Sequence, residues 1–314
     1  MNTMIPFEWL EQAHERISPY VVKTSLTFDS QNDLYLKWEN HQVTGSFKAR
    51  GALNKVFALE EWELERGLVT ASAGNHGQGV ALAGRIRPSQ VIVFASEHAI
   101  PNKLQAMRDL GAEIHLVPGG YAQAENAGIS YARERSATWV SPYNDGLIIA
   151  GQGTIALEAF EQLKVPDPIT WVVPAGGGGL LSGIGCALAR LSPGSKLVGV
   201  QSEASAFLHH IYHQGTQQGV EELPSLADGL SGPVENGSVT VSLVKQYATD
   251  FILVSESEIR QAIRYAWDAY HECIEGSAAV ALAAVLSGKV STRPALLVLT
   301  GGNINPTDLE QILG

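Results

Sequence analysis

Cysteine and long apolar runs are the scarcest features of this sequence. It has two cysteines in 314 residues, Cys186 and Cys273, and they form no Cys-x-x-Cys pair. We therefore expect two buried, reduced thiols rather than a disulfide framework or a zinc site. No apolar run approaches the ~20 residues that span a bilayer, and the N-terminal segment lacks the basic-then-apolar order of a signal peptide. These absences predict a cytoplasmic protein without a membrane partner.

Positive charge is scarce as well. The chain has 21 lysines and arginines against 32 aspartates and glutamates, so its formal net charge is -11. Nucleic acids and anionic membranes are bound by basic surfaces, so we expect neither as the main partner. An anionic small ligand has to be held by local positive groups or by helix N-termini instead.

Strand-like and helix-like segments alternate along most of the chain. Runs rich in β-branched residues predict strands, and the segments between them have helical periodicity. This alternation is typical of an α/β fold whose parallel sheets are wound by helices. Gly111 is placed to end one helix, and the polar segment 209–233 predicts a long surface loop. The predicted strands are residues 91–95, 113–117, 169–174, 196–200 and 295–300.

The motif TGSFKARGA places Lys48 where a helix is expected to begin. A lysine amine forms a Schiff base with an aldehyde, and it does so in its neutral form. The positive end of the helix dipole and partial desolvation both lower the pKa of a lysine in such a position. Lys48 is therefore the candidate catalytic residue, with an ordinary solvated surface lysine as the alternative.

Four consecutive glycines, Gly176, Gly177, Gly178 and Gly179, lie between a strand-like and a helix-like segment. A flexible linker would be flanked by polar sequence, and this run is not. Glycine lets the backbone approach a phosphate closely, and the following helix N-terminus supplies N–H donors. The run matches neither the dinucleotide-binding nor the Walker pattern. We interpret it as a phosphate cradle.

A third motif, ASAGNHGQG, stands at another predicted strand-to-helix junction. It brings Ser72, Ala73, Asn75 and His76 to a helix start, an arrangement that suits a carboxylate. The alternative is an ordinary helix cap with a structural histidine.

Pyridoxal phosphate carries an aldehyde and a phosphate on one small ring. The lysine and glycine motifs together therefore indicate this cofactor.

The order of motifs, from about residue 23 to residue 305, resembles the fold type II pyridoxal-phosphate enzymes, in the family of threonine/serine dehydratases and serine racemases. The resemblance implies a fold like that of the tryptophan synthase β subunit. A large domain of residues 1–66 and 145–314 and a small inserted domain of residues 67–144 are expected to hold the cofactor between them. The motifs are TGSFKARGA, SAGNHGQG, IAGQGT, PAGGGGLLSG, ADG, EGSAAVALAA and TGGN.

The resemblance also implies a role for individual residues. Lys48 is expected to bind the cofactor covalently, Phe47 to pack on its ring, and Asn75 to hydrogen-bond the ring hydroxyl. Thr300 is expected to face the pyridine nitrogen. The expected cofactor-binding residues are Phe47, Lys48, Asn75, Gly176, Gly177, Gly178, Gly179, Leu180 and Thr300, and the expected substrate-binding residues are Ser72, Ala73, Asn75 and His76.

The activity that the resemblance implies is α,β-elimination, the dehydration and deamination of a β-hydroxy amino acid such as L-threonine or L-serine to a 2-oxo acid and ammonia. A hydroxyl at Thr300 supports a protonated ring less well than a carboxylate, which favours prompt loss of the β-substituent. Larger substrates stay open, namely 3-hydroxyaspartate, a phenylserine-like amino acid or a hydroxyectoine-derived compound. The other classes of function are a β-replacement enzyme, an amino-acid racemase and a non-catalytic binding module.

Three departures from the family pattern bear on these alternatives. Serine racemases carry a second serine where this chain has Ala73, and a methyl group transfers no proton, so elimination is favoured over racemisation. In members with a divalent metal site a Glu precedes an Asp, whereas Glu203 here is followed by His209 at the acidic position. No metal ligand is therefore predicted, and dependence on a divalent or monovalent cation stays open. The chain ends at Gly314, so no C-terminal regulatory domain is expected.

Two further expectations concern histidines and assembly. His209, His210 and His213 are either a ligand cluster or, as we favour, a solvated group. The resemblance makes a homodimer the expected assembly.

Overall fold

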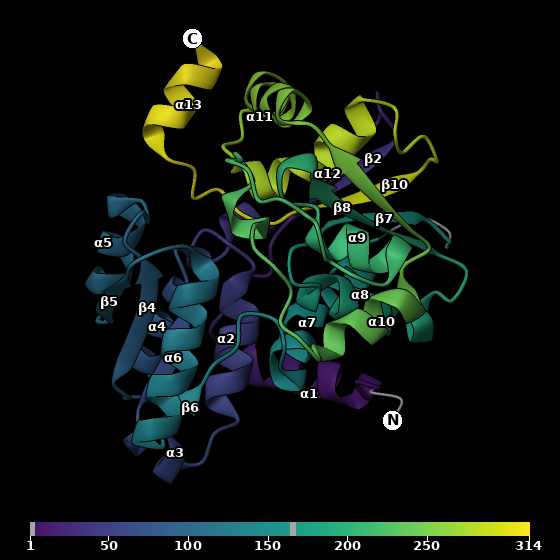
Figure 1. The fold of residues 1–314 in the computed structure, drawn as a ribbon. Helices are drawn as coiled ribbons and strands as arrows, with labels where there is room; N and C mark the ends of the chain where they lie inside the picture. Colours follow the sequence, from purple (N-terminus) through teal and green to yellow (C-terminus); the bar gives the residue numbers. More distant parts are fainter. Residues whose placement is uncertain (1–3, 164–167) are drawn as a thin grey trace.

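The computed structural model of the chain describes residues 4–163 and 168–314, which form two lobes, each built on a β-sheet (Figure 1). The six-stranded sheet has the order β1-β2-β10-β7-β8-β9, and the four-stranded sheet has the order β5-β4-β3-β6. The strands are β1 (Leu26–Asp29), β2 (Leu34–Trp38), β3 (Leu68–Ala71), β4 (Val91–Ser96), β5 (Glu113–Val117), β6 (Thr138–Trp139), β7 (Thr170–Pro174), β8 (Lys196–Ser202), β9 (Asp250–Val254) and β10 (Ala295–Leu299).

Helices surround both sheets. The four-stranded sheet and α4, α5 and α6 form the blue lobe on the left of Figure 1. The α-helices are α1 (Phe7–Ile17), α2 (Lys48–Phe57), α3 (Glu61–Glu65), α4 (Asn75–Ile86), α5 (Pro101–Asp109), α6 (Tyr121–Arg135), α7 (Gly146–Gln162), α8 (Gly179–Leu191), α9 (Phe207–Gln214), α10 (Val239–Tyr247), α11 (Glu256–Tyr270), α12 (Gly276–Leu286) and α13 (Pro306–Leu313). Short 3-10 helices are η1 (Glu39–His41), η2 (Glu203–Ser205) and η3 (Asp228–Leu230).

The predicted α/β class is confirmed, with one exception to the parallel sheets. All pairs of neighbouring strands run parallel except β1 and β2, which are antiparallel. The reason is the short turn between them, in which Asp29 Oδ1 accepts hydrogen bonds from the N–H groups of Gln31 and Asn32 and Asp33 has a φ of 54°. Such a turn joins neighbouring strands without a crossover helix.

The predicted surface loop at 209–233 was wrong at its start. Residues 207–214 form α9, whose buried face includes Phe207, Leu208 and Ile211. Gly215, with a φ of 81°, ends this helix. The helix is amphipathic, so its apolar residues are packed while its histidines lend the segment a polar composition.

The two lobes meet through helices as well as through loops. Helix α2 packs against α4, and a Cβ built on Gly79 of α4 would lie 3.1 Å from both the Lys48 carbonyl oxygen and the Ala52 Cβ. Glycine at this crossing therefore lets the helix that begins with Lys48 lie against the helix that begins with Asn75. The domain boundaries at 66/67 and 144/145 stay a prediction.

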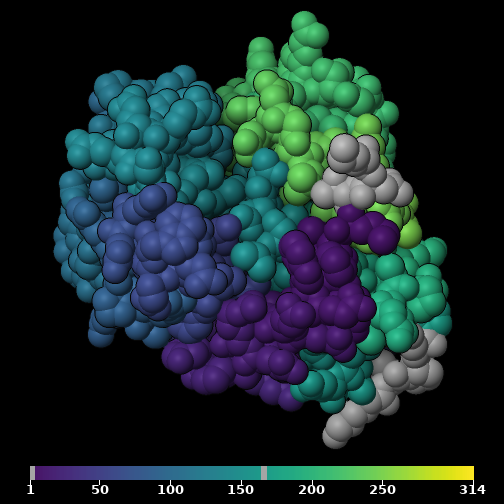
Figure 2. Space-filling model, turned by 90° about the horizontal axis from the view of Figure 1, so that it is seen from below, coloured from purple at the N-terminus to yellow at the C-terminus, as the bar shows by residue number. Residues whose placement is uncertain are grey.

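The core lies around both sheets. The sequence of α12, GSAAVALAAVL, is small and apolar on every side, and all but its last residue are buried, as expected for a helix enclosed by other elements. Helix α1 packs on α7, α2 and α8. Figure 2 shows this N-terminal segment, in purple, on the surface beside the blue part of the chain.

Both cysteines are free thiols. Cys186 is buried, as predicted, whereas Cys273 is only half-buried. Within the described residues, none of the helices has the length and apolar character needed to cross a bilayer.

Candidate active site

All the residues predicted to bind cofactor or substrate line one cavity of about 610 Å³. They come from the starts of α2, α4 and α8, and from the end of β10. The structure therefore brings together segments that lie up to 253 positions apart, Phe47 and Thr300 being joined directly by a hydrogen bond of 3.0 Å from the Phe47 N–H to the Thr300 carbonyl oxygen.

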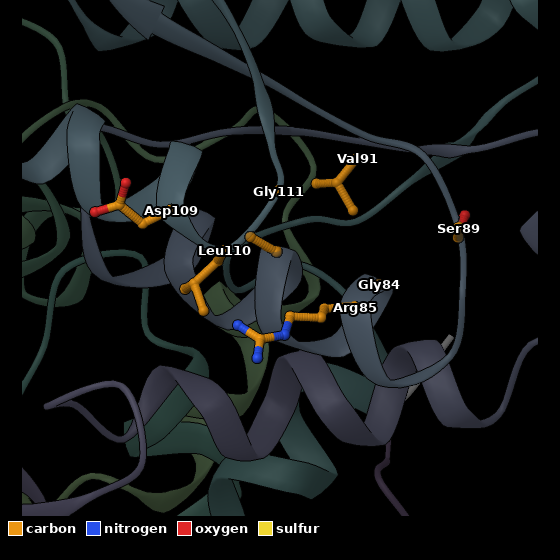
Figure 3. Close-up of a pocket in the computed structure, with 8 residues that line it drawn as sticks. Gly84, Arg85, Ser89, Val91, Asp109, Leu110 and Gly111 are labelled. Carbon is orange, nitrogen blue, oxygen red and sulfur yellow. The ribbon is translucent and has the colours of Figure 1, made fainter.

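A second hollow, of about 350 Å³, contains none of these residues (Figure 3). It lies beside the C-terminal ends of α4 and α5, where Arg85 and Asp109 are its charged lining residues. Because the second hollow lacks the predicted site residues, the cavity around Lys48 is the candidate active site.

Lys48 is the first residue of α2, as the sequence predicts. Gly45, with a φ of 71°, turns the chain before it, and Ser46 pairs with Gly301 in an isolated β-bridge. Together with the bond from Phe47 to Thr300, these contacts fix the helix start against the TGGN segment. Lys48 is therefore held by two backbone segments rather than by its helix alone.

The Lys48 amine has no carboxylate partner among the described residues. Its Nζ donates a hydrogen bond of 2.9 Å to the carbonyl oxygen of Pro142 and lies 5.3 Å from the centroid of the Phe47 ring. Burial lowers the pKa of Lys48 from 10.5 to about 8, and the more distant Glu275 carboxylate opposes this shift. The neutral amine is therefore accessible near neutral pH, as a nucleophile or base requires.

The four glycines join β7 to α8. Gly178 has a φ of 87°, and a Cβ on Gly177 would lie 2.4 Å from the Tyr143 ring. A Cβ on Gly176 would lie 3.0 Å from the Leu230 Cα. Side chains are excluded here by neighbouring backbone and ring atoms, so the loop presents its backbone and the N-terminus of α8 to the cavity. This is the arrangement that binds a phosphate.

The third motif leads from β3 into α4. The Ser72 hydroxyl accepts a hydrogen bond of 3.0 Å from the Gly74 N–H, and α4 begins at Asn75. The first N–H groups of a helix have no partner within it, so they are available to an anion in the cavity. The loop therefore suits a carboxylate.

His76 is buried and neutral. Burial, followed by the nearby Lys48, lowers the pKa of its imidazole to about 3. Its Nε2 lies 3.1 Å from the Val140 carbonyl oxygen, which can only accept, so Nε2 carries the proton. Nδ1 is left as an acceptor without a partner in the described part of the chain. His76 can therefore accept a hydrogen bond at Nδ1 but is a poor base.

Asn75 is oriented by a chain of side chains that crosses the two lobes. Its Nδ2 donates to Glu275 Oε1 at 2.7 Å, and its Oδ1 accepts from Asn303 Nδ2 at 2.7 Å. The amide can face only one way, because the group that meets its oxygen is Asn303 Nδ2, which also donates to the Thr44 carbonyl oxygen and can only donate. One N–H of Asn75 stays available for a ligand oxygen.

Sequence reasoning missed Glu275 as a site residue. It caps α12, is buried, and lines the cavity. Burial raises its pKa to about 7, although Lys103 opposes the shift. The motif EGSAAVALAA contained a signal, since an acidic residue before an entirely apolar helix has little solvent around it. Lys103, Tyr121 and Gln152 also line the cavity without having been predicted.

The residues present fit pyridoxal phosphate. The cavity contains an amine with a lowered pKa, a glycine loop that leads into a helix N-terminus, the Phe47 ring and the Thr300 hydroxyl. An aldehyde, a phosphate, an aromatic ring and a ring nitrogen each have a chemically suitable neighbour in one space. The individual roles of these residues stay predictions.

The residues around Glu203 do not fit a divalent cation. The Glu203 carboxylate lies 3.9 Å from the ammonium of Lys289, and its side chain is 54% exposed. Burial, then His213 and His210, lowers the pKa of His209 to about 4. Among the residues that the structure describes, no group of three His, Cys, Asp or Glu side chains could hold a metal.

The three histidines of α9 have other contacts. His210 Nδ1 lies 2.8 Å from the Thr216 carbonyl oxygen, and His213 Nε2 lies 3.1 Å from the Phe251 carbonyl oxygen. The ring of His209 packs against that of His213, with 4.4 Å between centroids. Two of the histidine rings are thus bonded to backbone and the third packs on a neighbouring ring, so none of them is assigned to a metal.

Comparisons with known proteins agree with this geometry. Residues 12–301 match the family described as pyridoxal-phosphate dependent enzymes. The chain is 38% identical to an L-threonine ammonia-lyase of Thermotoga maritima, over 99% of this chain and 78% of the relative. Maize serine racemase has a similar structure, with a TM-score of 0.88, 30% identity, and coverage of 97% of this chain and 95% of that one. Threonine deaminase isoform 2 of Solanum lycopersicum has a TM-score of 0.88 and 27% identity, with 98% and 92% covered.

Proposed function

Because this chain belongs to the pyridoxal-phosphate dependent enzymes, we propose that it deaminates a β-hydroxy amino acid, with L-threonine and L-serine as substrates. The reaction removes the α-proton and the β-hydroxyl, and after uptake of water it yields a 2-oxo acid and ammonia. The observation that carries the proposal is the convergence of the Lys48 amine, the glycine loop and the Ser72–His76 loop on one cavity.

In this proposal the chain's own residues bind, orient and move protons. The backbone N–H groups at the start of α8 hold the cofactor phosphate, and those at the start of α4 hold the substrate carboxylate. The bound cofactor supplies an electron sink for the pair left at the α-carbon. Lys48 Nζ takes the α-proton, because its lowered pKa leaves a neutral fraction of the amine near pH 7.

Orientation comes from groups that do not titrate in the reaction. Asn75 is fixed by Glu275 and Asn303 so that an N–H faces the cavity. His76 stays neutral and offers an acceptor at Nδ1. These groups position the ligand, Lys48 takes the α-proton, and the β-hydroxyl leaves as water after it has taken up a proton.

The lining of the cavity favours an apolar β-substituent. Lys103 is paired with Asp228, so among the described lining residues Lys48 is the one buried cation without a carboxylate partner. A second substrate carboxylate, as in 3-hydroxyaspartate, would meet Glu222 and Asp228 rather than a free cation. The remaining wall is largely apolar or aromatic, with Phe94, Ala95, Ala99, Ile100, Tyr121, Ala124, Leu223 and Leu230.

The test is a panel of β-hydroxy amino acids incubated with the holoenzyme, with 2-oxo acid and ammonia measured separately. We expect equal amounts of both products from L-threonine and L-serine, and little from 3-hydroxyaspartate. Ammonia without 2-oxo acid, or no product from any member of the panel, would refute the proposed function.

The size of the cavity favours a second candidate substrate. A cavity of about 610 Å³ has room for a larger side chain, so a phenylserine-like amino acid is the alternative within the same reaction. The same panel decides between them through kcat/KM. A ratio that rises from threonine to phenylserine would assign the larger substrate.

Racemisation is the second candidate activity, because maize serine racemase is similar in structure. Ala73 lines the cavity but carries no proton donor. Exchange of the α-proton with solvent, followed by chiral analysis of unreacted L-serine, measures this activity. We expect Ala73→Ser to increase it, whereas equal D-serine formation by both proteins would remove the significance given to Ala73.

The proposal also includes a homodimer in the cytoplasm. Val22 and Val43 lie side by side, since the Gln42 Oε1 accepts hydrogen bonds from both of their N–H groups, and both side chains are exposed, as is Tyr20. This apolar surface supports contact with a second copy. The two free thiols support a reducing compartment. Light scattering of the purified protein tests the assembly.

A further inference from the structure

An ion pair closes one wall of the cavity between segments that belong to different sheets. Lys103 lies in α5, which connects β4 and β5 of the four-stranded sheet, and Asp228 lies in η3, between β8 and β9 of the six-stranded sheet. Lys103 Nζ lies 2.5 Å from Asp228 Oδ2, and the two side chains are 13% and 42% exposed. The pair is thus half-buried and joins the two lobes.

The pair also separates two spaces. Lys103 and Asp228 line both the active-site cavity and an adjoining cavity of about 430 Å³, together with Ile100, Pro224, Ser225 and Glu275. The ion pair is therefore part of the wall that the two cavities share.

Lys103 lies against one segment that the proposed reaction uses, and Asp228 belongs to the short helix that lies against the other. A Cβ built on Gly74 would lie 3.1 Å from Lys103 Cδ, so the lysine stem lies on the substrate loop. Asp228 lies in η3 together with Leu230. A Cβ built on Gly176 of the glycine loop would lie 3.0 Å from the Leu230 Cα. The N–H of Gly229, next to Asp228, is itself fixed by Ser277 Oγ at 3.0 Å.

We propose that Lys103 and Asp228 form a latch that holds the substrate loop and the glycine loop at a working separation. The proposal rests on the proposed function, because only a substrate held by one loop and attached to a cofactor held by the other needs that separation. Both are positioning residues, since they act through Gly74 and Leu230. Direct capture of the substrate carboxylate by Lys103 is the competing explanation.

A charge swap separates the two explanations. The variants are Lys103→Glu, Asp228→Lys and the double variant, and the measured quantities are KM and kcat for L-threonine and the Kd for pyridoxal phosphate from absorbance titration. A latch predicts that each single variant raises KM about tenfold, the scale of a half-buried charge interaction, with kcat nearly unchanged. It further predicts recovery of KM in the double variant, because the ion pair is restored in reverse. Cofactor affinity stays the same in all three.

Three results would overturn the proposal. The first is a KM in the double variant that stays as high as in the worse single variant, which assigns Lys103 to the carboxylate itself. The second is a normal KM in both single variants. The third is a tenfold KM increase in the control Lys289→Glu, which breaks the 2.7 Å ion pair of Lys289 with Glu258 away from the cavity.

A measurement without substrate keeps the latch distinct from the proposed function and from misfolding. Amide hydrogen exchange of the holoenzyme at residues 72–76 and 226–231 should accelerate in Lys103→Met and Asp228→Asn, with thermal unfolding close to that of the wild type. If L-threonine gives no 2-oxo acid, the proposed function fails, and faster exchange in these two segments alone still supports the latch. Exchange equal to that of the wild type removes it.

Discussion

Two cationic side chains on α2, Lys48 and Arg50, lie two positions apart and have opposite surroundings. Arg50 donates to Glu158 Oε1 at 2.7 Å and to Glu39 Oε2 at 2.8 Å, and these carboxylates outweigh burial and raise its pKa above the ordinary value. Lys48 meets the Pro142 carbonyl oxygen instead, and burial lowers its pKa to about 8. At Arg50 two carboxylates offset the effect of burial on the pKa, and at Lys48 no paired carboxylate in the described part of the chain does so.

The cluster around Arg50 is balanced in charge. Lys37 Nζ donates to Glu158 Oε2 at 2.9 Å and to the Thr24 carbonyl oxygen at 2.7 Å, so two cations face two carboxylates. All four side chains are at most 2% exposed. The charge-balanced cluster holds α2 in place. The Lys48 amine at the start of the same helix has no carboxylate partner within residues 4–163 and 168–314, so it is available to react.

The largest expected effect comes from removing the unbalanced amine. Lys48→Ala should reduce 2-oxo acid formation by about 10³-fold or more, because the proposed covalent link and the proposed base are lost together. Borohydride reduction of the holoenzyme followed by mass spectrometry measures the link directly. Lys245→Ala, which removes an exposed lysine of α10, is the matched control. Full activity in Lys48→Ala would show that the reaction does not need the Lys48 amine.

Removing one carboxylate of the balanced cluster should mainly affect stability. Glu158→Gln leaves Lys37 and Arg50 with Glu39 alone, and we expect a loss of about 3–5 kcal/mol in the free energy of unfolding. Urea unfolding measures it. The control is Glu161→Gln on the same helix, whose ion pair with Lys23 is about half exposed, with an expected loss of ~1 kcal/mol or less. Equal losses in the two variants would show that burial of the cluster has no special effect.

The pH dependence of cofactor capture sharpens the same contrast. A lowered pKa of Lys48 means that the neutral amine increases as the pH rises and dominates above about pH 8. The rate of covalent capture of pyridoxal phosphate by the apo protein should therefore rise about tenfold per unit at lower pH and level off above this value. Stopped-flow absorbance measures the rate. A midpoint near the ordinary value of 10.5 would show that Lys48 is not desolvated.

The smallest expected effect is a shift of that profile in Glu275→Gln. Glu275 is the charge that opposes the lowering of the Lys48 pKa, so its neutralisation should move the midpoint to lower pH. The variant should also alter pH-dependent stability. The folded-state pKa of Glu275 is raised from 4.5 to about 7, so its stabilising contribution is complete below pH 4.5 and is lost as the pH rises through 7. Glu275→Gln should remove that loss in urea unfolding, and Glu310→Gln, at an exposed site, should not.

Much of the fold could be predicted because its strands are short apolar runs. The strand predicted at 113–117 has the bounds of β5, and those predicted near β4, β7, β8 and β10 agree within two residues. The β1–β2 hairpin was missed, because LTFD and LYLKW are short and their turn contains no glycine. Burial alone does not decide which strands a local pattern reveals, because the exposed strand β5 was predicted and the buried strand β2 was not.

Some residues of the candidate site could likewise be predicted from the sequence, and others could not. Lys48 and the glycine loop could be found because helix starts and glycine runs are local features. Glu158 and Glu275 could not be ranked among the chain's 32 acidic residues, because their side-chain partners lie more than a hundred positions away in the sequence. The apolar residues after Glu275 indicate that it is buried, but they do not indicate which side chain it meets.

The thiol of Cys186 lies next to the N-terminal segment and can report its movement. Cys186 Sγ donates a hydrogen bond of 3.0 Å to the Ile5 carbonyl oxygen, and burial raises the pKa of this thiol to about 11. We therefore expect alkylation of this buried sulfur to be faster when the segment around Ile5 moves away. The rate of Cys186 alkylation would therefore report movement of this N-terminal segment, and it can be measured in the wild-type protein.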